Sequence, residues 1–145
     1  SDKMLIRQLI ENQLQAFQAN DLATALSLTS PKIQNKFTLA DFSQIMTAKY
    51  GAILKPRSVM FRGFTLVNNF PALIAMIMDQ SGNLVKVVFI VQHQQDYSWR
   101  VHGYELAGIN EKIVGLKIYP DSRLSKVFNY LTQPDLISSS KSASN

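Results

Sequence analysis

The sequence predicts an α+β domain in which helices come first and a curved antiparallel sheet follows. Up to residue 50, apolar residues recur every three or four positions, which is the period of an amphipathic helix. After Pro56 the chain changes to short runs of β-branched and aromatic residues separated by turn-forming residues. Helices followed by a meander of strands are typical of an α+β fold with the helices on one face of the sheet.

The first expected helix has one continuous apolar face. Asp2 is expected to cap it, and Ile6, Ile10, Leu14 and Phe17 follow at steps of four, four and three residues. Such a helix packs one side against the rest of the domain and leaves the other side in water.

Three shorter helices are expected before residue 51, each with a recognisable start. An aspartate caps the second, a proline occupies the first turn of the third, and a threonine with an aspartate three residues later forms a capping box for the fourth. A glycine is expected to stop the fourth helix. These residues are Asp21, Pro31, Thr38 with Asp41, and Gly51.

Four strands are expected in the second half of the domain. They span residues 59–67, 73–79, 84–92 and 99–106. Residues 80–83, with the sequence Gln-Ser-Gly-Asn, predict a hairpin, and the other links are also short, so consecutive strands are expected to be antiparallel neighbours. Gly63 and Gly103 lie inside strands and predict bulges that let the sheet curl.

The third expected strand is apolar on both faces. One side carries Val85, Val87, Phe89 and Val91, and the other carries Leu84, Val88 and Ile90 with Lys86 and Gln92 as the polar residues. A sheet face in contact with water is more polar than this. The second face is therefore expected to be covered, either by a second copy of the chain in a homodimer or by the C-terminal segment.

The domain is expected to occupy residues 1–107, a common size for one hydrophobic core. Residues 108–134 are expected to be an extension that packs on the domain or on a partner, and residues 135–145 a disordered Ser-rich tail. Within the extension, the apolar pattern is compatible with a strand over residues 113–119 and a short helix over residues 124–131.

Composition excludes several classes of function. The chain has no cysteine, so disulfides, thiolate zinc sites and thiol nucleophiles are ruled out. The net charge of +5 is spread along the chain without a Lys/Arg-rich run, which favours a solvated basic surface over nucleic-acid binding. No apolar run is long enough to span a membrane, so a soluble domain is expected, either cytoplasmic or exported after removal of an N-terminal leader.

Short sequence signatures at a particular order and spacing resemble a known superfamily. They are Ile6 to Phe17 with Ala19-Asn20-Asp21, then Ser30-Pro31-Lys32-Ile33, Tyr50 with Lys55-Pro56-Arg57-Ser58-Val59, and Ser98-Trp99-Arg100-Val101. Over residues 4–107 the chain resembles the cone-shaped ketosteroid-isomerase and scytalone-dehydratase superfamily, also called cystatin-like, and within it a bacterial family described as a domain of unknown function. The resemblance implies a pocket between the helices and the concave sheet, and dimers through the sheet. It implies no reaction, because this scaffold hosts both enzymes and non-catalytic domains.

Four residues are candidates for acid–base chemistry in such a pocket. Ketosteroid isomerases combine a carboxylate base with a tyrosine donor, and here the strand acids are Asp79 and Glu105 and the candidate donors are Tyr50 and Tyr104. Asp79 adjoins the hairpin turn, where an aspartate normally accepts turn N–H groups. By alternation from Val101, the Glu105 side chain is expected either inside the pocket or at a solvated strand end.

The remaining candidates have ordinary structural interpretations beside functional ones. Arg57 can bind a carboxylate or phosphate, or pair with a helix terminus, and Trp99 is a core anchor or, with Tyr50, part of a ligand site. His93 and His102 are expected at the surface or in an interface, because alternation places His102 opposite Trp99. Two histidines without an acidic cluster do not make a metal site, and no cofactor is expected.

Two functions remain open from the sequence. The first is a non-enzymatic domain that dimerises through its sheet and holds a small apolar or amphipathic ligand, or a partner peptide, in the cone. The alternative is a small-molecule isomerase or lyase that uses Glu105 or Asp79 with Tyr50 or Tyr104.

Overall fold

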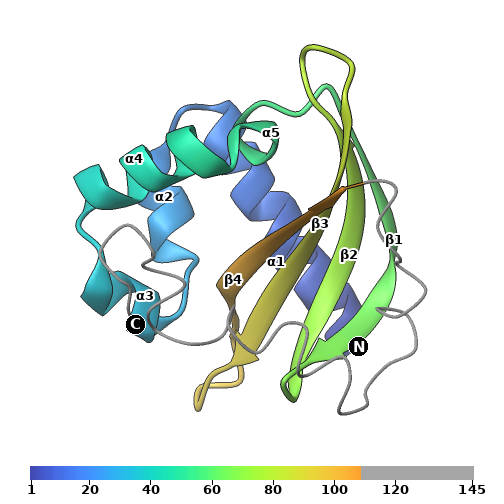
Figure 1. Cartoon of the computed structure of the whole chain (residues 1–145). Coiled ribbons are helices and arrows are strands. Elements are labelled where there is room, and N and C mark those ends of the chain that lie inside the picture. Colours follow the sequence, from blue (N-terminus) through green and yellow to red (C-terminus); the bar gives the residue numbers. More distant parts are fainter. Residues whose placement is uncertain (109–145) are drawn as a thin grey trace.

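The computed structural model describes residues 1–108, which form helices followed by strands (Figure 1). The helices are α1 (Asp2–Gln18), α2 (Leu22–Ser27), α3 (Pro31–Lys36), α4 (Leu39–Lys49) and α5 (Gly51–Leu54). The strands are β1 (Ser58–Val67), β2 (Phe70–Met78), β3 (Leu84–His93) and β4 (Trp99–Gly108). The strand predicted over residues 113–119, the helix over 124–131 and the Ser-rich tail lie outside the described residues.

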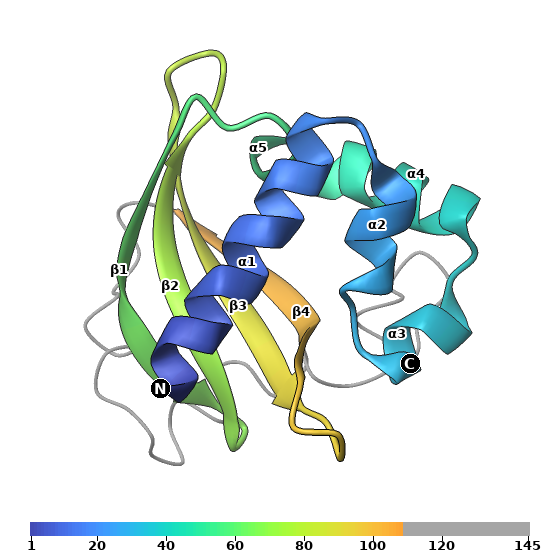
Figure 2. The same ribbon diagram turned by 180° about the vertical axis from the view of Figure 1, so that it is seen from behind.

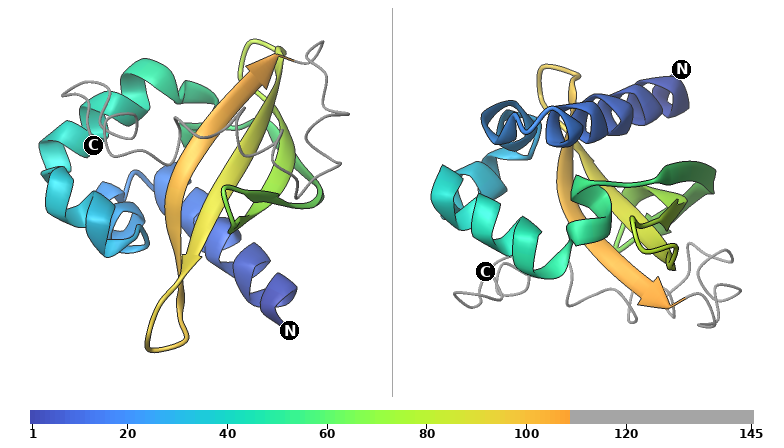
Figure 3. Two further views of the ribbon diagram at one scale, coloured as in Figure 1. Left: turned by 60° about the horizontal axis from the view of Figure 1, so that its bottom comes forward. Right: turned by 90° about the horizontal axis from the view of Figure 1, so that it is seen from above.

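The described strands form one antiparallel sheet in the order β1-β2-β3-β4, and the helices lie on one of its faces, here called the inner face. Seen from behind, α1 crosses this face diagonally, with its N-terminus beside β1 and its C-terminus near α5 (Figure 2). Helices α2 to α4 continue beyond the β4 edge, so the layers open on that side (Figure 3). This arrangement confirms the predicted α+β fold.

The predicted helix starts are confirmed with one exception. Thr38 Oγ1 accepts a hydrogen bond from the Asp41 N–H at 3.0 Å, and Asp41 Oδ2 accepts from the Thr38 N–H at 3.3 Å, which completes the capping box. Asp21 caps α2 by accepting from Thr24 N–H at 3.1 Å. The cap of α1 is Ser1 rather than Asp2, because Ser1 Oγ accepts from Met4 N–H while Asp2 lies in the first turn.

Two boundaries differ from the sequence prediction by more than two residues. Gly51 does not end the helical region, because α4 is followed directly by the short helix α5. Strand β2 begins at Phe70, earlier than predicted, since Asn68 and Asn69 form the whole turn with φ of 51° and 71°. Pro71 is tolerated in β2 because pairing with β3 begins only at Ala72.

The main core lies between the inner face and the helices. Aromatic side chains fill its centre, with Phe17 stacked on Phe42 and Tyr104 packed against Phe89. Around them lie the buried apolar residues Ile10, Leu14, Met46, Ile53, Leu73, Ile77, Val87 and Val101. Burial of this apolar surface makes the largest contribution to holding the helices on the sheet.

Both predicted bulges are present and shift the side-chain alternation. In β1 the register slips between Phe61 and Gly63. In β4, Val101 pairs with Val91 and Gly103 with Ile90, so His102 is the extra residue. The second bulge turns Tyr104 into the core and leaves Glu105 opposite Val88, on the other face of the sheet.

The outer face of the sheet points away from the helices but is also buried. Its apolar residues Ala72, Ile74, Val88 and Ile90 are at most 5% exposed, and Lys86 lies fully buried among them. These low exposures agree with the expectation that the second face of the sheet is shielded from water. Among the described helices, none is long and apolar enough to cross a membrane.

The two edges of the sheet differ. The edge of β4 is closed by the segment before α3, where Thr29 forms a parallel bridge with Val101. Ser30 N–H donates to Val101 O, and Val101 N–H donates to Leu28 O, both at 2.8 Å. The edge of β1 carries no strand partner among the described residues.

Candidate functional site

Side chains occupy the space between the helices and the inner face of the sheet, here called the cone. The Tyr104 hydroxyl donates to Gln13 Oε1 at 2.8 Å, and Gln13 Nε2 donates to Ala25 O at 3.0 Å. Gln13 is fully buried and Tyr104 is 7% exposed. The Tyr104 hydroxyl and the Gln13 amide at the centre of the cone therefore have hydrogen-bond partners within the protein, without a ligand.

A small apolar hollow lies at the mouth of the cone, between α3, α4 and β4, with a volume of about 20 Å³. Its lining is Ile33, Phe37, Phe42, Ile45, Met46, Tyr50, Gly103 and Tyr104. The resemblance implies a pocket at this position, but the volume suits a single water molecule rather than an organic ligand.

Three of the four catalytic candidates lie near this mouth. The Tyr50 and Tyr104 rings are 5.3 Å apart. Burial, followed by the negative charge of Glu105, raises the pKa of Tyr50 to about 12. Burial also raises the pKa of Tyr104 well above its usual value. Both phenols therefore stay protonated at neutral pH, and Glu105 acts on Tyr50 from outside the hollow, which it does not line.

Asp79 is far from the other three, at the β2–β3 turn. Its Oδ1 accepts hydrogen bonds from the N–H groups of Ser81 and Asn83, both at 2.9 Å. This is the turn role that the sequence predicted, and it removes Asp79 from the cone.

His102 is buried, so the surface position, one of the two expected for it, is wrong; the interface position stays a prediction. The bulge places it against Phe70, with ring centroids 4.8 Å apart, and its Nδ1 is 2.7 Å from Ser30 Oγ. It is 4% exposed. Burial, assisted by the positive charge of Lys32, lowers the pKa of His102 to about 4. The side chain is thus a neutral tether between β4 and the start of α3.

The candidates for ligand binding do not converge. Trp99 stacks on His93, with ring centroids 4.3 Å apart, and packs at the margin of the core, as a core anchor does. Its Nε1 is shielded from water and has no hydrogen-bond partner among residues 1–108. Arg57 is exposed at the start of β1, beside Gly82 of the β2–β3 turn. Tyr50 lies at the mouth of the cone, so the three residues mark separate places.

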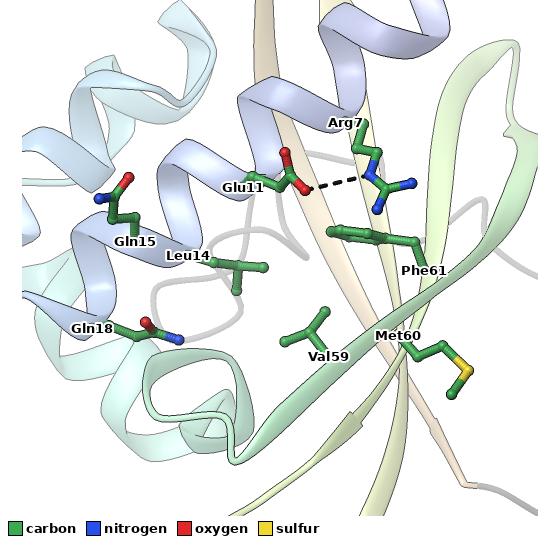
Figure 4. A pocket seen from close by; sticks show the side chains of 8 residues that line it. All are labelled: Arg7, Glu11, Leu14, Gln15, Gln18, Val59, Met60 and Phe61. Carbon is green, nitrogen blue, oxygen red and sulfur yellow. Dashed lines mark hydrogen bonds and ion pairs between the residues drawn. The ribbon is translucent and has the colours of Figure 1, made fainter.

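A larger hollow, which we call the α1–β1 groove, runs between the first helix and the edge strand (Figure 4). Its volume is about 460 Å³, and its lining residues are Arg7, Glu11, Leu14, Gln15, Gln18, Val59, Met60 and Phe61. Arg7 lies over the Phe61 ring at 4.9 Å and pairs with Glu11 at 3.4 Å. Met60 points away from the helix in Figure 4 and is 59% exposed.

Sequence reasoning missed this groove, although a signal was present. Lys3, Arg7, Glu11, Gln15 and Gln18 recur at helical spacing and form a polar stripe along α1. The sequence does not reveal that this stripe borders an edge strand rather than open solvent. Gln13 was also missed, although its place within the apolar face of α1 indicates a buried polar group.

A third hollow, of about 570 Å³, lies beside the β3–β4 turn. It is lined by Pro31, Gln92, His93, Gln94, Gln95, Asp96 and Arg100. Arg100 Nη1 donates hydrogen bonds to the carbonyl oxygens of Ser27 and Thr29. The Arg100 side chain therefore binds the segment before α3. Within residues 1–108, no three His, Asp or Glu side chains gather as metal ligands do.

Comparison with known proteins gives a family match. A family model described as Domain of unknown function (DUF4864) matches residues 1–113, which include every helix and strand described above. No curated protein and no solved structure matches the chain.

Proposed function

Given that the chain belongs to the family Domain of unknown function (DUF4864), whose description assigns no reaction, we propose that the domain is a non-catalytic protein-interaction domain. The observation that carries this proposal is the filled cone. The side chains of Gln13 and Tyr104 hydrogen-bond to each other. The hollow at the mouth has a volume of only about 20 Å³.

The positions of the candidate acids support the same proposal. A general base must reach its substrate within hydrogen-bond distance. Asp79 is held by its own turn, and Glu105 does not line the mouth hollow. The isomerase or lyase alternative would require the Tyr104–Gln13 bond to break and the aromatic core to move apart before any substrate could enter.

The α1–β1 groove is an open hollow on the surface of the described domain. Its volume of about 460 Å³ falls within the range of about 300–1,000 Å³ seen for binding pockets. It borders the edge of β1, which has no strand partner within residues 1–108. A groove beside such an edge suits an extended peptide, because the edge offers backbone hydrogen bonds and the groove accepts side chains.

Two binding measurements on the full chain test this function. Selection from a phage library of random dodecapeptides is expected to enrich peptides that bind saturably. Titration with a steroid, a fatty acid and the dye anilinonaphthalene sulfonate is expected to raise Tm by less than about 2 °C. A small molecule that binds saturably, and loses affinity in Ile45→Trp at the mouth of the cone, would overturn the proposal.

We also propose that the outer face of the sheet is covered by the chain's own residues 109–145 rather than by a second copy. Ala72, Ile74, Val88 and Ile90 on this face are at most 5% exposed, and the described helices all lie on the opposite face. The segment follows directly from β4 and carries apolar residues throughout residues 113–131. Under this proposal, the predicted C-terminal extension packs on its own domain.

Cross-linking can separate the two ways of covering the face. The chain has no cysteine, so a pair introduced as Met76→Cys with Leu116→Cys is the sole reactive pair. A short bismaleimide is expected to join the two within one chain, at the mass of a monomer. A covalent dimer from Met76→Cys alone, together with a dimeric mass for the wild type in light scattering, would instead favour the homodimer through the sheet.

A further inference from the structure

Basic residues lie on and next to the edge strand β1 and the helix beside it. Lys3 and Arg7 on α1, Arg57 just before β1 and Arg62 within β1 are all exposed. Glu11 is the acid within the groove, and it pairs with Arg7 at 3.4 Å. The remaining three cations make no ion pair with another described residue, so the margin keeps an excess of positive charge.

Helix α1 and strand β1 run in opposite directions along this margin. Lys3 lies over the Phe64 ring at 5.6 Å, and Arg7 lies over the Phe61 ring at 4.9 Å. Further along the helix, Gln18 lines the groove together with Val59. A row of cations and amides therefore runs parallel to the strand edge, on the side toward which an added strand would direct every second side chain.

The open part of the edge is the stretch before the bulge, residues 58–61. The register slip between Phe61 and Gly63 interrupts regular pairing beyond it. Bulges and charged residues on an edge strand are also devices that prevent pairing with another copy of the same chain. In an antiparallel pair of two copies over residues 58–61, Arg57 of one copy would face Arg62 of the other, and like charges repel.

We propose that the α1–β1 groove binds an extended acidic segment of another protein, which adds as a strand to residues 58–61 of β1. This inference rests on the proposed function and adds that the partner segment is acidic. Backbone hydrogen bonds to the edge provide the attachment, and the apolar floor of Leu14, Val59 and Phe61 takes an apolar side chain. Carboxylates are selected by Lys3 and Arg7 along α1 and by Arg57 and Arg62, which flank residues 58–61 in the sequence.

The groove itself explains why the partner is acidic rather than neutral. An apolar floor alone binds many sequences, whereas rim charges decide which partner associates and how fast. An acidic segment would also compete with Glu11 for Arg7, which already lies over Phe61 and loses little freedom when it pairs. Neutralising Glu11 is therefore expected to strengthen binding.

The selected peptides test this proposal on the full chain. Peptides rich in Asp and Glu are expected, with a Kd about tenfold weaker for the double variant Arg57→Glu/Arg62→Glu and about twofold tighter for Glu11→Gln. The matched control Lys32→Glu reverses an exposed charge on α3, away from the groove, and is expected to change the Kd by less than about twofold. Raising the salt from about 0.05 M to about 0.5 M is expected to weaken binding at least fivefold.

Hydrogen exchange distinguishes strand addition from a contact made by charges alone. Strand addition is expected to slow amide exchange within residues 58–61 when the peptide is bound. Enrichment of neutral or basic peptides, or acidic peptides that leave these amides unprotected and tolerate the Arg57→Glu/Arg62→Glu change, would overturn the groove proposal and leave the interaction function standing. Failure to enrich any peptide would overturn both.

Discussion

The hydroxyl of Tyr104 donates to the side-chain oxygen of Gln13 at 2.8 Å, and this bond joins β4 to α1 through the centre of the domain. The amide of the same glutamine reaches Ala25 O at 3.0 Å, which adds α2 to the connection. The buried Gln13 side chain thus connects α1, α2 and β4. A polar group of Gln13 or Tyr104 that lost its hydrogen bond would lie in an apolar core.

Gln13→Leu is expected to lower the free energy of unfolding by about 2–3 kcal/mol, because it leaves the Tyr104 hydroxyl buried without a partner. It also removes one of the two hydrogen bonds to the Ala25 carbonyl, which still accepts from Leu28 N–H at 3.3 Å. Tyr104→Phe is expected to cost less, since it removes a donor and leaves one acceptor. Urea unfolding measures both. The double variant should cost less than the two single changes together by about 1 kcal/mol, and strict additivity would contradict the connection.

Stability is expected to fall in acid because His102 is buried as the neutral imidazole. Its pKa is lowered from 6.5 to about 4, so between these pH values the unfolded chain binds a proton that the folded chain does not. The stabilisation is complete above pH 6.5 and is lost as the pH falls toward about 4, approaching about 3 kcal/mol. Urea unfolding at several pH values checks this. His102→Gln should remove most of the slope, whereas His93→Gln, at an exposed site, should keep it.

The negative charge of Glu105 is expected to be visible in the titration of Tyr50. Burial sets most of the rise of the Tyr50 pKa to about 12, and Glu105 adds to it by disfavouring the phenolate. Glu105→Gln should therefore lower the titration midpoint of Tyr50, followed by NMR of ring-labelled tyrosine. Asp79→Asn, at the distant β2–β3 turn, is the control, and an equal effect from that variant would contradict the assignment.

Removing the capping box of α4 is expected to lower the stability of the domain. Thr38→Ala removes the acceptor for Asp41 N–H, which lies at 3.0 Å, and should cost about 1 kcal/mol in urea unfolding. Thr47→Ala, an exposed change in the body of the same helix, should be neutral within about 0.5 kcal/mol. Equal costs for the two variants would mean that the box contributes nothing.

The sequence predicted the helices and strands because local signals agree with the final fold. The apolar period of α1, the capping box of α4 and the hairpin at residues 80–83 need no distant partner. The helix starting at Gly51 was missed because four residues carry no period, and the early start of β2 was missed because the Asn-Asn pair forms the whole turn.

The candidate site was harder to predict because it depends on the bulge at His102. One extra residue in β4 reverses the alternation beyond it, so Tyr104 faces the core and Glu105 does not. Gly103 indicated a bulge, but its effect on each side chain depends on which residue is left unpaired. The groove beside β1 depends on the placement of α1 across the sheet, which no local pattern encodes.

The bridge between Thr29 and Val101 has a consequence for the order of folding. The neighbouring contact between Ser30 and His102 joins residues 72 positions apart, and β4 is the last strand of the described chain. The entropic cost of closing such a long loop must be met before these contacts can form. During synthesis the helices emerge first and stay without their final partner until β4 has left the ribosome, so closure of the domain is expected to be a late and slow step.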